Sequence, residues 1–348
     1  MRIAHVSPLH FPVPPRDHGG TERVIDDLCH ALARRGHEVT LFAASGSTTA
    51  VTLVEQGPAV STIAGAPPSM PSAMECVMLD RVAAMADAFD IIHCHTELYH
   101  AAVLRGVAGK LVSTIHWRAD EADRQHYFRH FEKLRVVAIS KAQSRDIPAR
   151  NCSGVVHHGI PAERFAPGGA ARGDCVFLGR LTDQKRPDLA IAIARAAGMP
   201  ICLGGTIDVG NPTYFDNEVR PLLGAEARYV GPVAQPDKQE FLGEAAVLLF
   251  PIDWPEPFGL VMIEAMACGT PVVAFRRGST VEVVDEGVTG FVVDTVEEAA
   301  EAVRRARLLD RRAVRAQFLR RFTDETMASG YEAIYARMIA AADRKGPP

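Results

Sequence analysis

The chain has 348 residues, which is long for one hydrophobic core and suits two domains of average size. Hydrophobic residues make up 47% of it and the formal net charge is −4, so a global attraction to nucleic acid is excluded and no nucleic-acid partner is expected. The seven cysteines are scattered without metal-type pairing, which is typical of reduced cysteines in a cytoplasmic enzyme.

The opening residues MRIAHVSPL predict a β-strand that runs into a loop, without the apolar core and cleavage site of a signal peptide. No segment approaches the roughly 20 apolar residues that cross a bilayer. The arginine-rich stretch from Arg304 to Arg321 is interpreted as a solvated helix face, with peripheral contact to anionic lipid at the inner membrane face as the alternative. The expected location is therefore cytoplasmic.

Strands alternate with helices along the first part of the chain. A helix is predicted over residues 21–36, a loop over residues 55–71, and a second helix that includes residues 78–89. Strands are predicted at residues 2–7, 37–44, 90–96, 110–117 and 135–140. This alternation indicates a parallel sheet with helices on both faces.

A second series of the same kind follows a Pro/Gly-rich passage at residues 155–173, which is interpreted as a linker. Its strands are predicted at residues 174–181, 200–205, 227–233, 246–251, 271–275 and 290–294. We therefore predict an α/β protein with two doubly wound domains that face each other across a cleft. The predicted domains are residues 1–160 and 161–322, with a helix over residues 323–348 that packs across them.

The sequence EPFGLVMIE places Glu256 and Glu264 eight positions apart, slightly over two helical turns, so both carboxylates can face the same side. The pair lies between a predicted buried strand and a helix that Gly269 ends. Ligands bind at such carboxyl edges of parallel strands, and a helix N-terminus there favours an anion. Two solvated charges are the alternative, but Pro255 and Pro257 specify an unusual backbone around Glu256.

The loop after the first predicted strand contains Gly19 and Gly20, which let the backbone approach a ligand, and Thr21 is a candidate N-cap. This pattern resembles a phosphate or sugar cradle at a helix N-terminus, although a glycine pair also commonly just turns the chain. The spaced GxGxxG fingerprint of dinucleotide-binding proteins is absent from the sequence, so hydride transfer loses its main support.

Two cations follow the first strand of the second series. Arg180 comes just after this strand and Lys185 lies five positions further along, across a polar loop. A guanidinium and an ammonium at this spacing can embrace a diphosphate, whereas solvated surface cations are the alternative. They occur at the same predicted sheet edge as Glu256.

Histidines gather at the ends of the first-series strands and in the linker, namely His93, His95, His100, His116, His157 and His158. They could bind a metal, act as bases or donate to a sugar hydroxyl, and for any single one a structural role is the alternative. A metal is not expected, because no Asp or Cys set completes a site at ligand spacing. His93 and His95 are also expected to face opposite sides of their strand.

Together, the segments HGGTERV, HCHTE, TIHW, AISKAQ, HHGIPAERFAP, FLGRLTDQKRPDLAI, YVGPV and EPFGLVMIEAMACGTPVVAF resemble the retaining glycosyltransferases of family 4 over nearly the whole chain. The resemblance implies the GT-B fold, with two Rossmann-like domains. The first domain would hold the acceptor and the second would hold the nucleotide sugar. Departures from the family pattern at His18 and His158 leave the identity of the acceptor open.

The resemblance also implies roles for individual residues. Arg180 and Lys185 would neutralise the diphosphate leaving group without a metal ion, and Glu256 would bind hydroxyls of the donor sugar. Glu264 would bind the ribose and His116 would point at the sugar near the anomeric centre. The remaining substrate-binding residues expected are Gly19, Gly20, His95, Phe258, Gly259 and Leu260.

The function predicted on this basis is retaining, metal-independent transfer of a hexose from a UDP-glucose-like donor, with no cofactor. GDP-mannose or another nucleotide sugar is the alternative donor. The acceptor would be a carbohydrate, a lipid-linked compound or a small molecule. A non-hydrolysing nucleotide-sugar epimerase and a catalytically silent sugar-nucleotide sensor are the rival hypotheses.

Overall fold

A computed structural model describes residues 1–15, 19–169 and 173–344, so His18 lies outside the described residues. Contacts within the chain define two compact units. Unit 1 comprises Met1–Gly159 and Asp324–Pro348, and unit 2 comprises Ile160–Thr323. Within the described ranges, no helix is both long enough and apolar enough to cross a membrane.

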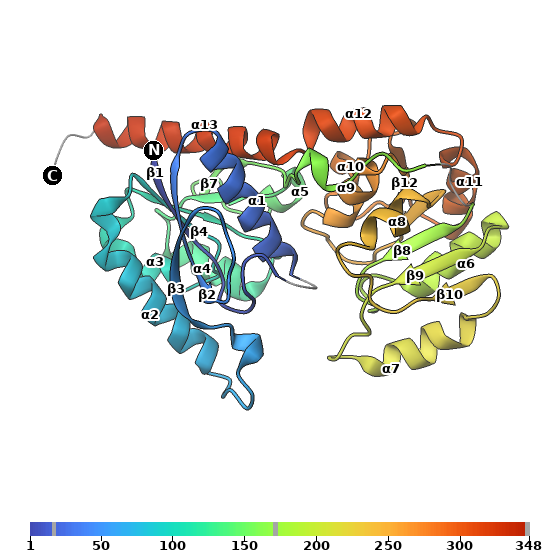
Figure 1. The fold of residues 1–348 in the computed structure, drawn as a ribbon, viewed down its shortest axis with the longest axis horizontal. Coiled ribbons are helices and arrows are strands. Elements are labelled where there is room, and N and C mark those ends of the chain that lie inside the picture. Colours follow the sequence, from blue (N-terminus) through green and yellow to red (C-terminus); the bar gives the residue numbers. More distant parts are fainter. Residues whose placement is uncertain (16–18, 170–172, 345–348) are drawn as a thin grey trace. The chain divides into compact units, whose positions relative to one another are not determined.

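The sheet of unit 1 has seven parallel strands in the order β3-β2-β1-β4-β5-β6-β7 (Figure 1). These strands are β1 (Arg2–Val6), β2 (Glu38–Ser45), β3 (Thr52–Pro58), β4 (Ile91–Cys94), β5 (Leu111–Thr114), β6 (Val136–Ala138) and β7 (Cys152–Val155). Successive strands are added toward one edge of the sheet up to β3 and toward the other edge from β4 onward. The boundary between β1 and β4 is therefore the switch point, where doubly wound folds bind ligands.

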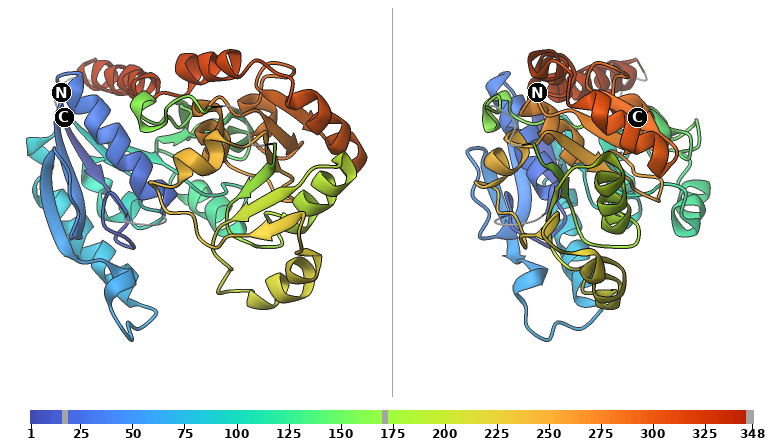
Figure 2. Two further views of the ribbon diagram at one scale, coloured as in Figure 1. Left: turned by 45° about the vertical axis from the view of Figure 1, so that its right-hand side comes forward. Right: turned by 90° about the vertical axis from the view of Figure 1, so that its right-hand side faces the viewer.

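The side chains of successive β1 residues point to opposite faces of this sheet. Ala4 and Val6 pack in one core cluster with Leu79 of α2, whereas His5 lies on the opposite face. Figures 1 and 2 show α1 and α2 on either side of the sheet. The helices of unit 1 are α1 (Gly20–Arg34), α2 (Met70–Ala84), α3 (His100–Val103), α4 (Ala122–His130), α5 (Lys141–Ser144) and α13 (Asp324–Asp343).

The last helix, α13, follows unit 2 in the chain but belongs to unit 1, where it packs against α1. Two tyrosines of α13 contact side chains of the sheet. The Tyr335 hydroxyl lies 2.7 Å from Nδ1 of His93, and the Tyr331 hydroxyl lies 2.9 Å from Oγ1 of Thr114. Both tyrosines are buried. The carboxyl-terminal segment therefore completes the first unit.

Unit 2 repeats the topology with six parallel strands in the order β10-β9-β8-β11-β12-β13. These strands are β8 (Cys175–Leu178), β9 (Ile201–Gly204), β10 (Ala227–Tyr229), β11 (Val247–Phe250), β12 (Val272–Phe275) and β13 (Gly290–Val293). The switch point here lies between β8 and β11. The expectation of an α/β protein with two Rossmann-like sheets is confirmed.

The helices of unit 2 alternate with its strands. They are α6 (Pro187–Ala197), α7 (Pro212–Tyr214), α8 (Lys238–Gly243), α9 (Leu260–Ala267), α10 (Thr280–Val283), α11 (Val296–Ala306) and α12 (Arg311–Arg321). Ile191 and Ile193 of α6 and Val303 of α11 belong to one buried cluster with the central strands. This cluster holds in place the strand ends that carry the candidate functional site described below.

Two predictions about local structure were wrong. Residues 55–58 belong to the edge strand β3 rather than to a loop, because the segment pairs in parallel with β2 despite its Gly and Pro. Helix α1 begins at Gly20, so Gly19 is its N-cap and Thr21 lies inside the first turn. Gly19 has a φ of 136°, a conformation that a side chain at this position would strain.

Candidate functional site

Lys185 and Glu256 come together at the switch point of unit 2. Lys185 lies in the loop between β8 and α6, and Glu256 lies in the loop between β11 and α9. Because β8 and β11 are adjacent and parallel, both loops leave the same edge of the sheet. The Nζ of Lys185 donates a short hydrogen bond to Oε2 of Glu256. The loops are tied further by the amide of Asp253, which donates to the Gln184 carbonyl at 2.9 Å.

Trp254 contacts both members of this ion pair. Its indole Nε1 donates to Oε2 of Glu256 at 2.7 Å. The ammonium of Lys185 lies 4.9 Å from the centroid of the Trp254 ring system and 5.6 Å from that of Phe250. The side chains of Lys185 and Glu256 are only 17% and 10% exposed. The site is thus a nearly buried carboxylate held by an ammonium and an indole.

The backbone around Glu256 is clamped from a neighbouring loop. The amide of Ser279 donates to the Glu256 carbonyl at 3.0 Å, and the Ser279 hydroxyl donates to the Phe258 carbonyl at 2.7 Å. Gly278 has a φ of 54°, and a Cβ there would lie 2.2 Å from the Glu256 carbonyl oxygen. Only glycine allows this approach. Glu256 is therefore held in an extended loop before the helix.

The helical spacing assumed for Glu256 and Glu264 was wrong, because α9 begins at Leu260 and contains Glu264 alone. Gly259 precedes the helix with a φ of 81°, and a Cβ there would lie 2.7 Å from the Met262 side chain. Phe258 is buried. The turn leaves the first backbone N–H groups of α9 at the strand edge, where they can meet an anion or a sugar oxygen.

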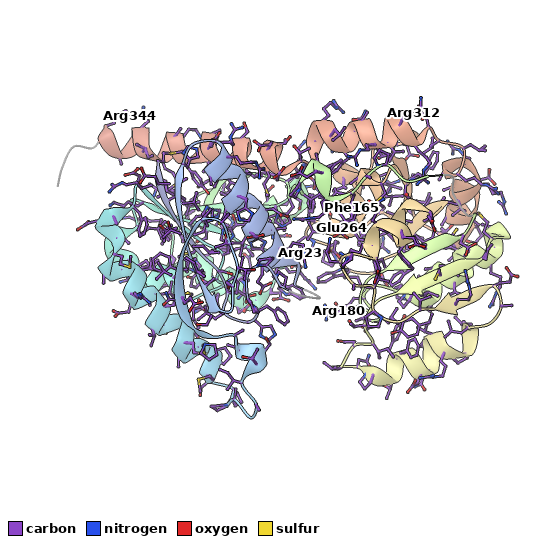
Figure 3. All side chains as sticks on the ribbon, viewed as in Figure 1. Arg23, Phe165, Arg180, Glu264, Arg312 and Arg344 are labelled. Atoms are coloured by element: carbon purple, nitrogen blue, oxygen red, sulfur yellow. The ribbon has the colours of Figure 1, made fainter. Side chains whose placement is uncertain are left out.

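Glu264 has a cationic partner that sequence reasoning missed. Lys238 of α8 places its Nζ at 2.8 and 3.0 Å from the two carboxylate oxygens of Glu264. The side chain of Glu264 is nearly buried. Twenty-six positions separate the two residues, so neither spacing nor composition could reveal the pair. Glu264 is labelled in Figure 3.

Arg180, also labelled in Figure 3, is more exposed than the members of the Lys185–Glu256 and Lys238–Glu264 pairs. One guanidinium nitrogen lies 3.6 Å from Asp208, and 49% of its side chain is exposed. Arg180 and Lys185 therefore take part in separate ion pairs. Such an exposed pair contributes little to stability, which leaves the guanidinium available to a ligand at small cost.

In unit 1, the predicted glycine cradle lies at the start of α1. A Cβ on Gly19 would lie 3.0 Å from two side-chain atoms of Pro15, so the chain packs tightly here. Arg23, labelled in Figure 3, donates to the Pro15 carbonyl at 2.9 Å. Glu22 is buried beside Gly19, and burial raises the pKa of its carboxyl. The loop before α1 is thus fixed by the first turn of the helix.

Three imidazoles form a hydrogen-bonded file at the switch point of unit 1. Nδ1 of His5 lies 3.0 Å from Nε2 of His95, and Nδ1 of His95 lies 2.9 Å from Nε2 of His116. The His116 ring stacks on that of His158, with centroids 5.2 Å apart. The file therefore brings together the predicted residues His95 and His116 and adds His5, which sequence reasoning did not single out.

These histidines are neutral. Burial lowers the pKa of His5 and of His116 to about 3, and it lowers the pKa of His95 well below its ordinary value. An imidazole that stays neutral can donate from one nitrogen and accept at the other. The histidine file thus offers polar groups without charge.

His93 and His95 lie on the same face of β4, with ring centroids 4.1 Å apart. The expectation of opposite faces was wrong, because residues two positions apart on a strand share a face. Nitrogen atoms of His5, His93 and His95 lie within 4.8 Å of one another and are close enough to hold a metal ion. Both His93 nitrogens already contact hydroxyls, those of Tyr335 and Thr114. An ion bound to one His93 nitrogen would have to displace one of these two contacts, and metal independence stays a prediction.

Three arginines of the arginine-rich segment bond to other parts of unit 2. Arg311 donates to the carbonyls of Gly243 and Ala245 at 2.6 and 2.8 Å, and Arg321 pairs with Asp285 at 2.6 Å. The third, Arg315, donates to the carbonyls of Phe165 and Ala162 at 2.7 and 2.8 Å. These arginines join α12 to the rest of unit 2, and lipid contact by the segment stays a prediction.

Two family models match the chain. The model described as Glycosyltransferase Family 4 matches residues 18–164, and the model described as Glycosyl transferases group 1 matches residues 171–320. Similar curated proteins include D-inositol 3-phosphate glycosyltransferases of Mycobacterium tuberculosis and Mycobacterium bovis, which are 31% identical over 256 residues. The match takes in 65% of this chain, and the chain spans about half (52%) of the length of those relatives.

Solved structures share the fold over nearly the whole chain. AviGT4, a glycosyltransferase involved in avilamycin A biosynthesis, is 24% identical with a TM-score of 0.75, covering 97% of this chain and 98% of its own. Sucrose-phosphate synthase from Thermosynechococcus elongatus is 21% identical with a TM-score of 0.77, covering 98% and 99%. Alr3699/HepE from Anabaena, in complex with UDP and glucose, is 20% identical with a TM-score of 0.73, covering 97% and 99%.

Proposed function

The chain belongs to family 4 of the GT-B glycosyltransferases, and from this membership we propose that it transfers a hexose from a nucleotide-diphosphate sugar to an acceptor hydroxyl, with retention at the anomeric carbon. The proposed donor is a UDP-hexose such as UDP-glucose. Alr3699/HepE, which shares the fold, was crystallised with UDP-glucose, and this supports the choice. The proposed acceptor is a carbohydrate, a lipid-linked compound or a small molecule.

One observation carries the proposal: a lysine and a glutamate meet at the switch point of unit 2, with a second carboxylate on the adjacent helix. A diphosphate needs cations, and a sugar needs acceptors for its hydroxyl groups. Lys185 and Arg180 offer the cations at this edge. Glu256 and Glu264 offer the carboxylates, Glu256 for the sugar and Glu264 for the ribose.

The proposed reaction breaks the bond between the anomeric carbon and the phosphate oxygen, and the electron pair of this bond leaves on the diphosphate. Lys185 and Arg180 stabilise the negative charge that develops there. The acceptor oxygen attacks from the same face, and its proton passes to the leaving phosphate oxygen. Glu256 holds the sugar hydroxyls and is not a nucleophile in this scheme. Charge neutralisation by side chains is proposed to suffice without a metal ion.

Unit 1 is proposed to bind the acceptor. The file of His5, His95 and His116 ends at the carboxyl edge of the sheet, and neutral imidazoles suit the recognition of hydroxyl groups because they both donate and accept. His116, the half-buried member of the file, would contact the donor sugar near its anomeric centre. Gly19 and Gly20 would let the backbone approach the donor diphosphate.

The proposal is tested by incubating the purified protein with UDP-, GDP-, ADP- and TDP-hexoses, with and without a mixture of candidate acceptors. Release of the nucleoside diphosphate is expected only with one nucleotide family and only when an acceptor is present. NMR of the product should show the anomeric configuration of the donor. Consumption of donor without acceptor, with formation of an epimeric nucleotide sugar, would contradict the proposal in favour of an epimerase.

A further inference from the structure

The ion pair between Lys185 and Glu256 raises a question about donor binding. In the described structure the ammonium that is proposed to bind the diphosphate already binds a carboxylate. A diphosphate can take Lys185 only if Glu256 gives it up. A nearly buried carboxylate that loses its cation needs another hydrogen-bond donor, since an unpaired buried charge is costly.

We propose that Trp254 is a positioning residue that keeps Glu256 in place while Lys185 passes from this carboxylate to the diphosphate of the donor. The inference rests on the proposed function, because it takes Lys185 as a ligand of the diphosphate. Trp254 contacts neither the reacting carbon nor the leaving group in this account. It acts through Glu256.

The contacts of Trp254 fit this role at both ends of the pair. Its indole N–H donates to Oε2 of Glu256 at 2.7 Å, on the same oxygen that accepts from Lys185. When Lys185 leaves, the indole bond remains and still fixes the direction of the carboxylate. The ring system lies 4.9 Å from the Lys185 ammonium, so it also attracts the cation during its movement.

Trp254 itself is held firmly. The residue is buried, and its carbonyl accepts from the amide of Glu256 at 2.8 Å. The preceding residue, Asp253, donates its amide to the carbonyl of Gln184, in the loop that carries Lys185. The backbone that carries the indole is therefore tied to the loop of Lys185 through the neighbouring residue. Sequence reasoning missed the residue, although it is one of two tryptophans in the chain and stands two positions before Glu256.

The first test is Trp254→Phe, which keeps an aromatic ring beside Lys185 but removes the N–H donor. We expect about a tenfold lower kcat, the effect of losing one hydrogen bond to a charged group, and a weaker affinity for UDP, because the indole bond is the one that holds Glu256 after UDP has taken Lys185. The matched control is Trp117→Phe, since Trp117 lies in unit 1 and donates to Glu121. An unchanged kcat or an unchanged affinity for UDP in Trp254→Phe would overturn the inference.

A double-mutant cycle separates positioning from general packing. If Trp254 acts through Glu256, then Trp254→Phe should not lower kcat further in a Glu256→Gln protein. An additive loss would show that the tryptophan acts independently of the carboxylate, and the inference would be wrong.

A second measurement needs no change at Trp254. In the Trp117→Phe protein Trp254 is the sole indole, and its fluorescence should change when a nucleotide draws Lys185 away from it. UDP, GDP, ADP and TDP are titrated by calorimetry and by emission excited at the red edge of indole absorption. We expect one nucleotide to change the emission with the midpoint seen in calorimetry.

The outcomes of this titration distinguish the two claims. Heat of binding by a nucleotide without a change of emission would overturn the role of Trp254 and leave the proposed function intact. Absence of binding by all four nucleotides, together with absence of transfer from their sugar conjugates, would overturn the proposed function and the inference with it.

Discussion

The two units of this protein share a strand order but differ in the chemistry at their switch points. All 13 histidines of the chain precede residue 159, so unit 2 contains none. The switch point of unit 1 carries a file of neutral imidazoles, whereas that of unit 2 carries the Lys185–Glu256 pair, with Lys238–Glu264 on the adjacent helices. The same fold thus places neutral imidazoles at one switch point and nearly buried ion pairs at the other, so the chemistry of each site follows from its side chains and not from the fold.

This difference matches the two proposed substrates. A diphosphate carries charge that develops further as it leaves, so it requires the cations of unit 2. An acceptor offers hydroxyl groups, for which neutral imidazoles are adequate partners. The comparison can be tested from both sides, by disturbing the neutral histidines and by removing individual charges.

The largest expected effect is a loss of stability of unit 1 in acid. Burial lowers the pKa of His5, His100 and His116 to about 3, against about 6.5 in an unfolded chain. Below pH 6.5 the unfolded state therefore binds more protons, and each such histidine lowers the free energy of unfolding by about 1.4 kcal/mol per pH unit down to its folded pKa. Unit 2 has no histidine to contribute this term.

Hydrogen exchange followed by mass spectrometry at pH 7 and at pH 5 measures this asymmetry, once exchange rates are corrected for pH. Peptides from residues 1–159 should lose protection at pH 5 more than peptides from residues 160–323. Equal loss of protection in both sets would show that the histidines are not the acid-sensitive groups.

Removal of the Lys185 ammonium is the next largest effect. Lys185→Ala should lower kcat about 100-fold or more, because one charge-stabilising contact to the leaving group is worth on the order of 3 kcal/mol. The control is Arg220→Ala, which removes an exposed cation of unit 2 that pairs with Asp216. Circular dichroism should show both variants folded. Near-normal turnover by a folded Lys185→Ala protein would remove the assignment of the diphosphate to this residue.

Replacement of Glu264 and replacement of Glu256 should have different effects on UDP binding and on turnover. Glu264→Gln is expected to weaken UDP binding about tenfold, because only Glu264 is assigned to the ribose. Glu256→Gln should lower turnover without weakening the binding of free UDP, because loss of the Glu256 charge frees Lys185 for the diphosphate. Calorimetric titration of UDP into both variants checks the prediction. Wild-type affinity in Glu264→Gln would refute the ribose role.

A chelator is expected to have no effect. If Lys185 and Arg180 neutralise the leaving group, turnover should survive treatment with EDTA, measured as nucleotide release under otherwise identical conditions. Loss of activity that magnesium restores would contradict metal independence. Loss that zinc alone restores would point instead to His5, His93 and His95.

Sequence patterns predicted both parallel sheets, because buried strands are continuous apolar runs bounded by turn residues. They missed β3 and β7, the two edge strands of unit 1, of which β3 contains a glycine and a proline and β7 contains a glycine. The Glu256 segment was recognisable because two prolines and a glycine surround an acid. Trp254, Lys238 and His5 were missed, since each meets its partner through tertiary packing that local spacing does not encode.

The most direct test of the account is thermal stabilisation of the purified protein by UDP, GDP, ADP, TDP and their sugar conjugates. A ligand that binds only the folded state raises the melting temperature by mass action. The account predicts a clear rise with one nucleotide family, UDP first, and its loss in Lys185→Ala. The absence of any rise with all nucleotides, or an undiminished rise in Lys185→Ala, would contradict the central claim that the switch point of unit 2 holds the donor diphosphate.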